Sequence, residues 1–242
     1  MSKKRQKSER KFPSKVIIFS CILGLIAVAV VGVAIINSVA ESRFVDEMAA
    51  ADEAFSSGDN KKIEEIVNRT VSSGDYAKIE KALKSYIGDV IANINGIDEV
   101  SNSEAVSKSL EGEYLGKNRN NLGAVISQLK EASGKVDSLT ADYKKLYNEE
   151  SVKDYIKDQN LNENFTALFT ENAKLFYDDK DLRNDYESML KVLSDTIHAE
   201  IKAVEYLDKN KSSWKIENNE ILFMNSAAAN AYSEILQSVA NS

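Results

Sequence analysis

Few side chains in this sequence are suited to catalysis at neutral pH, which usually requires a poised base, a nucleophile or a metal. The 242 residues include one histidine, His198, and one cysteine, Cys21. His198 follows Asp195 by three positions in a strongly helical stretch, which predicts a partly exposed ring that bonds or pairs with Asp195. A zinc site would have to draw its other ligands from carboxylates alone, which is uncommon. We therefore expect neither a catalytic histidine nor a zinc site.

One segment comes close to a calcium-binding helix–loop–helix. Asp158, Asn160 and Asn162 occupy the first, third and fifth positions of such a loop. The sixth position holds Glu163 instead of glycine, and the twelfth holds Phe169 instead of a bidentate glutamate. The sequence also contains no glycine-rich phosphate loop, nucleophile elbow or His-Glu-x-x-His pair. We predict a protein that is not an enzyme, with no catalytic, cofactor-binding or metal-ligating residues.

A candidate contact with a partner is Trp214, the only tryptophan of the chain. It begins an alternating segment, WKIENNEILF at 214–223. Apolar and polar residues alternate on both sides of Asn218 and Asn219, and asparagine tolerates the positive φ of a tight turn, so this segment predicts a small β-hairpin. A tryptophan beside such a hairpin either anchors a partner protein or seals the end of the helical core.

The first predicted element of the chain is an apolar run at 16–36, VIIFSCILGLIAVAVVGVAII. At about 1.5 Å per residue, a helix of this length crosses a hydrocarbon core roughly 30 Å thick. The segment 1–15 carries seven Lys and Arg against one acid, Glu9, and such a flank stays in the cytoplasm. We predict a basic cytoplasmic tail at 1–15 and a transmembrane helix at 16–36 in the lipid bilayer. The protein would then lie in the cell membrane as a single-pass protein with an extracytoplasmic C-terminal part.

A second interpretation of this N-terminus is a cleaved signal peptide. The residues SVA at 38–40 place small side chains at the two positions that signal peptidase reads. Cleavage after Ala40 would release a secreted helical factor. We favour a retained signal anchor, because the apolar run is longer than the roughly 7 to 15 residues of a cleaved signal.

The net charge of the chain limits the kinds of molecule that it can bind. The chain has 31 Lys and Arg and 38 Asp and Glu, and the part beyond the apolar run keeps 24 and 37 of them, a formal charge of −13. So acidic a domain repels the phosphates of nucleic acids and of anionic lipids. Proteins, cations or cationic peptides fit this charge better than polyanions do. We predict a protein partner, in or outside the membrane, and no nucleic acid.

The outer part is predicted to be mainly helical. Pro13 is the only proline in the chain, so the strongest helix breaker is missing from the outer part. We predict an all-α protein with a helical stalk at 37–56 and an extracytoplasmic helical bundle at 57–242, which includes the small C-terminal β-hairpin. A short repeat, SSGDNKKIE at 56–64 and SSGDYAKIE at 72–80, predicts two helix-to-helix corners capped by aspartate. The segment 95–121, which contains several Gly, Ser and Asn residues, is predicted to be loop with a short helix around 104–110.

The most regular apolar pattern lies at 122–146 and extends over about three heptads. Such a seam belongs either to one helix of an intramolecular bundle or to a coiled-coil homo-oligomer. Gly134 and the other amphipathic helices, the longest at about 181–210, favour the bundle. The seam consists of Leu122, Val125, Leu129, Ala132, Val136, Leu139, Tyr143 and Leu146.

Two classes of function remain for such a chain. The first is a non-enzymatic membrane-anchored envelope protein, whose outer helical bundle mediates protein–protein interaction or the assembly of a membrane complex. The second is an extracytoplasmic ligand-sensing domain, in which a pocket between helices holds a small molecule. Since a tail of 15 residues cannot hold an output module, such a sensor would signal through a partner protein.

Overall fold

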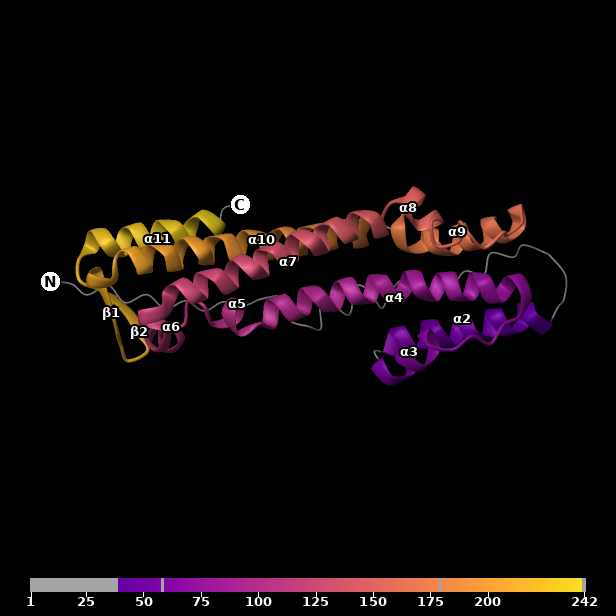
Figure 1. Ribbon diagram of the computed structural model, residues 1–242, viewed down its shortest axis with the longest axis horizontal. Helices are drawn as coiled ribbons and strands as arrows, with labels where there is room; N and C mark the ends of the chain where they lie inside the picture. Colours follow the sequence, from indigo (N-terminus) through magenta and orange to yellow (C-terminus); the bar gives the residue numbers. More distant parts are fainter. Residues whose placement is uncertain (1–38, 58, 179, 241–242) are drawn as a thin grey trace. The chain divides into compact units, whose positions relative to one another are not determined.

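The computed structural model describes residues 39–57, 59–178 and 180–240 (Figure 1). Most of these residues are helical, and two short strands form an antiparallel hairpin near the C-terminus, which confirms the predicted helical fold with a small hairpin. The predicted tail at 1–15 and transmembrane helix at 16–36 lie outside the described residues. Within the described ranges, no helix is both long and apolar enough to cross a bilayer.

The described residues fall into two compact units. Unit 1 comprises those at 96–140 and 187–240, and unit 2 those at 39–95 and 141–186. Three long helices contribute residues to both units: α4 (Gly74–Asn102), α7 (Leu122–Leu146) and α10 (Lys180–Lys209).

Unit 2 begins with the helix that follows the predicted membrane span. The inner face of this helix is buried and includes Phe44 and Met48, and the Phe44 ring lies 5.7 Å from that of Tyr76 on α4. The described part of the segment predicted as a stalk at 37–56 is therefore packed into unit 2. Besides parts of the long helices, unit 2 contains α2 (Val39–Ser57), α3 (Asn60–Val67), α8 (Glu149–Lys153) and α9 (Glu163–Tyr177).

The two predicted corners differ in how their helices begin. At the first, Asp59 caps α3 as predicted, because its carboxylate accepts a hydrogen bond from the Lys62 amide at 3.1 Å. At the second, Asp75 pairs with Lys78 at 2.7 Å within the first turn of α4. The residues that precede α4 donate instead to the carboxylate of Glu80.

Aromatic rings fill the centre of unit 2. Tyr143 and Tyr186 stack with ring centroids 4.7 Å apart, and the hydroxyl of Tyr143 donates to the Arg183 carbonyl at 3.0 Å. The hydroxyl of Tyr86 donates to the carbonyl of Leu146 at 2.9 Å. Burial raises the pKa of Tyr86 and of Tyr186, so both phenols remain protonated hydrogen-bond donors.

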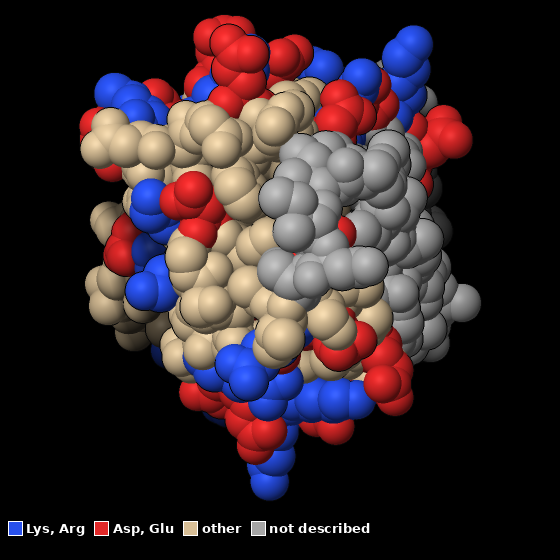
Figure 2. All heavy atoms as spheres, turned by 90° about the vertical axis from the view of Figure 1, so that its right-hand side faces the viewer, with Lys and Arg blue, Asp and Glu red and all other residues tan. Residues whose placement is uncertain are grey.

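One end of unit 2 is the face at which α2, α4 and α9 begin. In the described part of this face, uncharged side chains form a large area, and acidic and basic side chains lie above it, below it and on its left side (Figure 2). The first described residue of α2, Val39, is 72% exposed.

Unit 1 contains more regular structure than the sequence predicted. The segment 95–121 is mostly helical: α4 continues to Asn102, and two short helices follow, the first of which matches the one predicted at 104–110. Besides parts of the long helices, the unit contains α5 (Glu104–Lys108), α6 (Gly112–Asn118), η1 (Arg119–Asn121), η2 (Lys211–Ser213), β1 (Trp214–Glu217), β2 (Glu220–Phe223) and α11 (Ser226–Ala240).

The glycines in this segment are close-packing positions, which explains the wrong prediction of a loop. A Cβ at Gly96 would lie 2.6 Å from Cδ2 of Leu139 on α7. A Cβ at Gly112 would lie 2.1 Å from the carbonyl oxygen of Asn219 in the hairpin turn. At Gly112 the neighbour is backbone and leaves no room for a side chain, whereas at Gly96 the end of the Leu139 side chain would have to move aside.

The seam at 122–146 faces inwards. Leu122, Leu129 and Val136 are fully buried, and of the eight seam residues only Leu139 is half-buried. This burial within one chain agrees with the predicted intramolecular bundle. The alternative, a homo-oligomer formed through this seam, would need an apolar face that these residues do not expose.

The C-terminal hairpin has the predicted form. Trp214 pairs with Phe223 and Ile216 with Ile221, and the turn residues Asn218 and Asn219 have φ angles of 54° and 60°. Two successive residues with positive φ match the twist of an antiparallel two-residue hairpin. Helices α6 and α11 both contact the hairpin, which fixes its position in unit 1.

Candidate functional site

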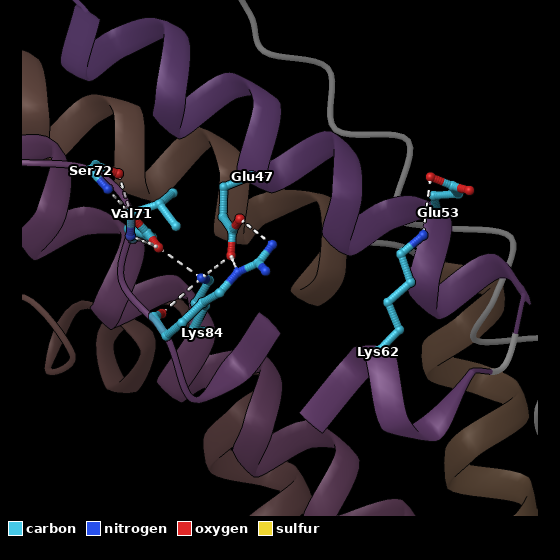
Figure 3. Close-up of polar contacts among 8 residues, drawn as sticks. Glu47, Glu53, Lys62, Val71, Ser72 and Lys84 are labelled. Atoms are coloured by element: carbon cyan, nitrogen blue, oxygen red, sulfur yellow. Dashed lines mark hydrogen bonds and ion pairs between the residues drawn. The ribbon is translucent and has the colours of Figure 1, made fainter. Parts of the chain in front are cut away.

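The first candidate site is a cluster of charged side chains in unit 2, at the junction of α2, the α3–α4 connection and α4 (Figure 3). Glu47, Glu80 and Lys84 are at most 4% exposed. Arg69 completes the cluster from a more exposed position, with 48% of its side chain accessible. Ionised groups are rarely buried unless each has a partner of opposite charge, and each buried member of this buried cluster has one.

Lys84 lies at the centre of the buried cluster. Its Nζ donates to Glu47 Oε1 at 2.6 Å and to Glu80 Oε1 at 2.7 Å. A third hydrogen bond, of 3.0 Å, reaches the carbonyl oxygen of Arg69. An ammonium group has three protons, so these acceptors use all of them.

The two carboxylates are held in different ways. Arg69 binds Glu47 in a bidentate pair, with Nε–Oε1 and Nη2–Oε2 distances of 2.8 and 2.7 Å. Glu80 accepts hydrogen bonds from the amides of Val71 and Ser72, at 3.1 and 2.9 Å, and from the Ser72 hydroxyl. Glu80 thus fixes the residues that lead into α4.

These contacts keep both carboxylates ionised. Burial alone would raise the pKa of Glu47, but the hydrogen bonds from Arg69 and Lys84 outweigh burial and hold that pKa below its ordinary value. Burial would also raise the pKa of Glu80. Hydrogen bonds from Lys84, Ser72 and Val71 outweigh this effect, so the pKa of Glu80 is lowered as well. A saturated ammonium ion between two acids of lowered pKa provides neither a base poised near neutral pH nor a nucleophile. The arrangement is that of a structural clamp between α2 and α4.

The residues that the sequence marked for chemistry are not brought together. The ring of His198 is exposed on α10, and its Nδ1 lies 2.8 Å from the carbonyl oxygen of Ser194. The predicted contact with Asp195 is wrong, because Asp195 pairs instead with Lys191 at 2.8 Å. Lys191 lies four positions earlier, which is favourable spacing for an ion pair on a helix.

The segment that resembles a calcium loop has structural roles. Asn160 adopts a φ of 50°, and Asn162 caps α9 by accepting the Phe165 amide at 3.1 Å. Over the described ranges, no group of three or more His, Cys, Asp or Glu side chains is placed to hold a metal ion. Cys21 lies outside the residues that the structure describes.

Trp214 does not present a surface to a partner, because its side chain is fully buried in unit 1. Its Nε1 donates to the Leu207 carbonyl at 2.8 Å, and the guanidinium of Arg119 lies over its ring, 5.0 Å from the centroid. Arg119 also donates to the carbonyls of Lys211 and Trp214, at 2.7 and 3.0 Å. The residue named as a candidate partner contact therefore seals the junction of α10, η1 and the hairpin.

A second candidate site is a concavity in unit 1 of about 400 Å³, partly open to solvent. It lies where the start of α6, strand β2 and helix α11 meet, and we call it the hairpin concavity. Its apolar residues come from three separate parts of the chain: Leu110, Ile221, Phe223, Tyr232 and Leu236.

The polar residues of the hairpin concavity are mainly acidic. Glu111, Glu113 and Glu220 line it together with Gly112 and Asn219, and none of the lining residues is Lys or Arg. Glu113 forms an exposed pair with Lys117 at 2.7 Å. Sequence reasoning missed this site because its apolar residues belong to segments that are distant in sequence.

No family model, curated protein or solved structure matches this chain.

Proposed function

We propose that this chain is a non-enzymatic, single-pass membrane-anchored envelope protein whose outer helical part binds another protein or helps to assemble a membrane complex. The hairpin concavity is the observation that carries the proposal. Its aromatic and aliphatic side chains are half-buried or buried next to a charged surface, and an apolar centre with a polar rim is typical of protein interfaces. The membrane anchor rests on the apolar run at 16–36 and its basic flank.

The buried cluster in unit 2 supports the same proposal indirectly. It is a dense group of ionisable side chains, yet its buried members bind one another and provide neither a base poised near neutral pH nor a nucleophile. The buried cluster also has a structural role next to the membrane, because it binds α2, which follows the predicted span directly. The clamp from Glu47 to Lys84 would hold the segment next to the membrane against the rest of unit 2.

The second candidate function is the sensing of a small ligand. A specific observation favours it: a volume of about 400 Å³ falls within the range of small-molecule sites. In this alternative, the domain would pass its signal to a partner protein.

Photo-crosslinking from inside the hairpin concavity tests the proposal. A photoreactive phenylalanine analogue at Leu236 of the full-length chain, in its native membrane, should give a reproducible adduct with another protein. The matched control is the same analogue at Lys202, an exposed residue of unit 1 that does not line the concavity. If Leu236 gives no adduct, or only the adducts that Lys202 also gives, the proposed role of this surface is wrong.

Thermal unfolding with a metabolite library separates the two candidate functions. Partner binding alone predicts no shift in melting temperature with small metabolites. A shift that grows with the concentration of one metabolite, as mass action requires, would favour the sensor.

A further inference from the structure

We infer that the hairpin concavity takes a cationic peptide segment of the partner protein, with a large apolar side chain seated on the floor of the concavity and flanking Lys or Arg residues at its rim. This inference rests on the proposed function and specifies the chemistry of the partner.

The floor of the concavity is apolar and firmly held. The rings of Phe223 and Tyr232 lie 5.2 Å apart, which joins β2 to α11. The hydroxyl of Tyr206 donates to the carbonyl of Ala228 at 3.1 Å, which ties α11 to α10. An apolar side chain that lands there meets a preformed surface, so little ordering is needed to bind it.

The rim provides the electrostatic argument. Glu111 precedes α6, Glu113 lies in its first turn, and Glu220 begins β2 on the other side. Lys117 offsets the charge of Glu113, but no Lys or Arg lines the concavity itself. The rim therefore keeps an excess of acidic groups, and the low-dielectric walls concentrate their negative potential. The formal charge of −13 on the chain beyond the apolar run adds a long-range attraction for cations.

The form of the site favours a peptide segment over a polyanion or a neutral ligand. Acidic groups repel the phosphates of nucleic acid or anionic lipid. The concavity is partly open to solvent, so one bound side chain can continue into a longer segment. Flanking cations of that segment would then reach the glutamates at the rim.

Fluorescence anisotropy with three labelled octapeptides tests this inference. The probe GKKFLKKG carries both features, GEEFLEEG reverses the charge, and GKKSSKKG removes the apolar centre. Full-length protein in nonionic detergent micelles should bind GKKFLKKG most tightly, after subtraction of its signal with empty micelles. This binding should weaken as salt is added, because rim charges are screened.

Variants locate the binding site of the probe. Glu111→Gln with Glu220→Gln should weaken binding of GKKFLKKG by roughly fivefold, as expected for the loss of two acidic rim groups, one exposed and one half-buried, and should flatten its salt dependence. Leu236→Gln should also weaken binding, through loss of apolar contact. The matched control, Glu99→Gln with Glu171→Gln, removes the same charge from exposed positions outside the lining and should leave the affinity unchanged. Unaltered melting temperatures confirm that each variant folds.

Three results would overturn the inference: equal binding of GEEFLEEG, equal binding of GKKSSKKG, or equal weakening in the control variant. Failure of the inference is distinguishable from failure of the proposed function. If GKKFLKKG does not bind but the analogue at Leu236 still captures a specific protein, the concavity binds a partner of other chemistry. If both experiments fail, the proposed function of this surface falls as well.

Discussion

Lys84 shows how a buried charge is tolerated in this protein. Its side chain is only 4% exposed, but its ammonium group meets two carboxylates and a carbonyl at 2.6 to 3.0 Å. Taking ions out of water costs several kcal/mol each, and attraction between partners offsets this cost only where the geometry is good. The buried cluster meets that condition, and removal of one member would leave another buried without its partner.

Substitution of Lys84 by methionine should therefore destabilise unit 2 strongly. The change leaves Glu47 and Glu80 buried with less compensation, at a cost of about 3 to 5 kcal/mol. The matched control is Lys78→Met, which breaks the partly exposed pair with Asp75 and should cost about 1 kcal/mol or less. Urea unfolding of the full-length chain, followed by circular dichroism, measures both. Equal losses in the two variants would show that the cluster is not a clamp.

The lowered pKa values of Glu47 and Glu80 predict loss of stability in acid. As the pH falls below about 5, the unfolded chain takes up protons at glutamates with pKa near 4.3, while the folded chain resists until lower pH. Protonation thus favours the unfolded state. The stability gap between wild type and Glu47→Gln should be large at about pH 7 and should close towards about pH 3. A gap that stays constant or widens in acid would contradict this account.

At the scale of elements, α6 and the hairpin turn depend on one another through Gly112. A side chain there would meet the backbone of Asn219, which cannot move without disturbing the turn. Gly112→Ala should destabilise unit 1 by about 1 to 3 kcal/mol, as in other overpacked sites. Gly134→Ala is the matched control, because a Cβ at Gly134 meets nothing within 4 Å in the middle of α7.

Gly134→Ala, the control substitution, should change the free energy of unfolding in the opposite direction. Replacing a glycine by alanine inside an exposed helix stabilises it by roughly 0.5 to 1 kcal/mol. Urea midpoints of the two variants should therefore move in opposite directions from wild type. Movement in the same direction would mean that the close contact between Gly112 and Asn219 does not set the position of the hairpin.

The elements that could be predicted are those whose pattern is local. The seam of α7, the length of α10 and the two asparagines of the hairpin are visible in short windows of sequence, and the structure agrees with each. The segment 95–121 was wrongly predicted as a loop, because sequence alone does not distinguish a glycine that allows close packing from a glycine that ends a helix. Only the neighbouring element, far away in sequence, distinguishes the two.

Both candidate sites escaped prediction for the same reason. Within the buried cluster, only Glu80 and Lys84 have a readable helical spacing of four. Glu47 lies 22 positions from Arg69 and 37 from Lys84, so the pairing exists only after α2 packs. The hairpin concavity likewise combines residues near 110 with residues near 220 and 235.

At the scale of the whole molecule, the two proposals depend on where the chain places its C-terminal part. A protein-binding concavity in unit 1 meets extracytoplasmic partners only if the basic flank at 1–15 stays in the cytoplasm. Cleavage after Ala40 would give the same exposure without an anchor. Sequencing the mature N-terminus separates these two alternatives, because an anchored chain keeps its basic tail.

A cysteine at Ser212, in a chain where Cys21 is replaced by serine, tests the topology directly. Ser212 is exposed in unit 1, so a membrane-impermeant thiol reagent should label it on intact cells. The matched control is a cysteine at Ser8, within the basic tail, which should react only after lysis. This outcome follows because Lys and Arg beside a membrane span are retained in the cytoplasm. Labelling of Ser8→Cys before lysis, with Ser212→Cys protected, would place the hairpin concavity inside the cell and remove the basis for an extracytoplasmic partner.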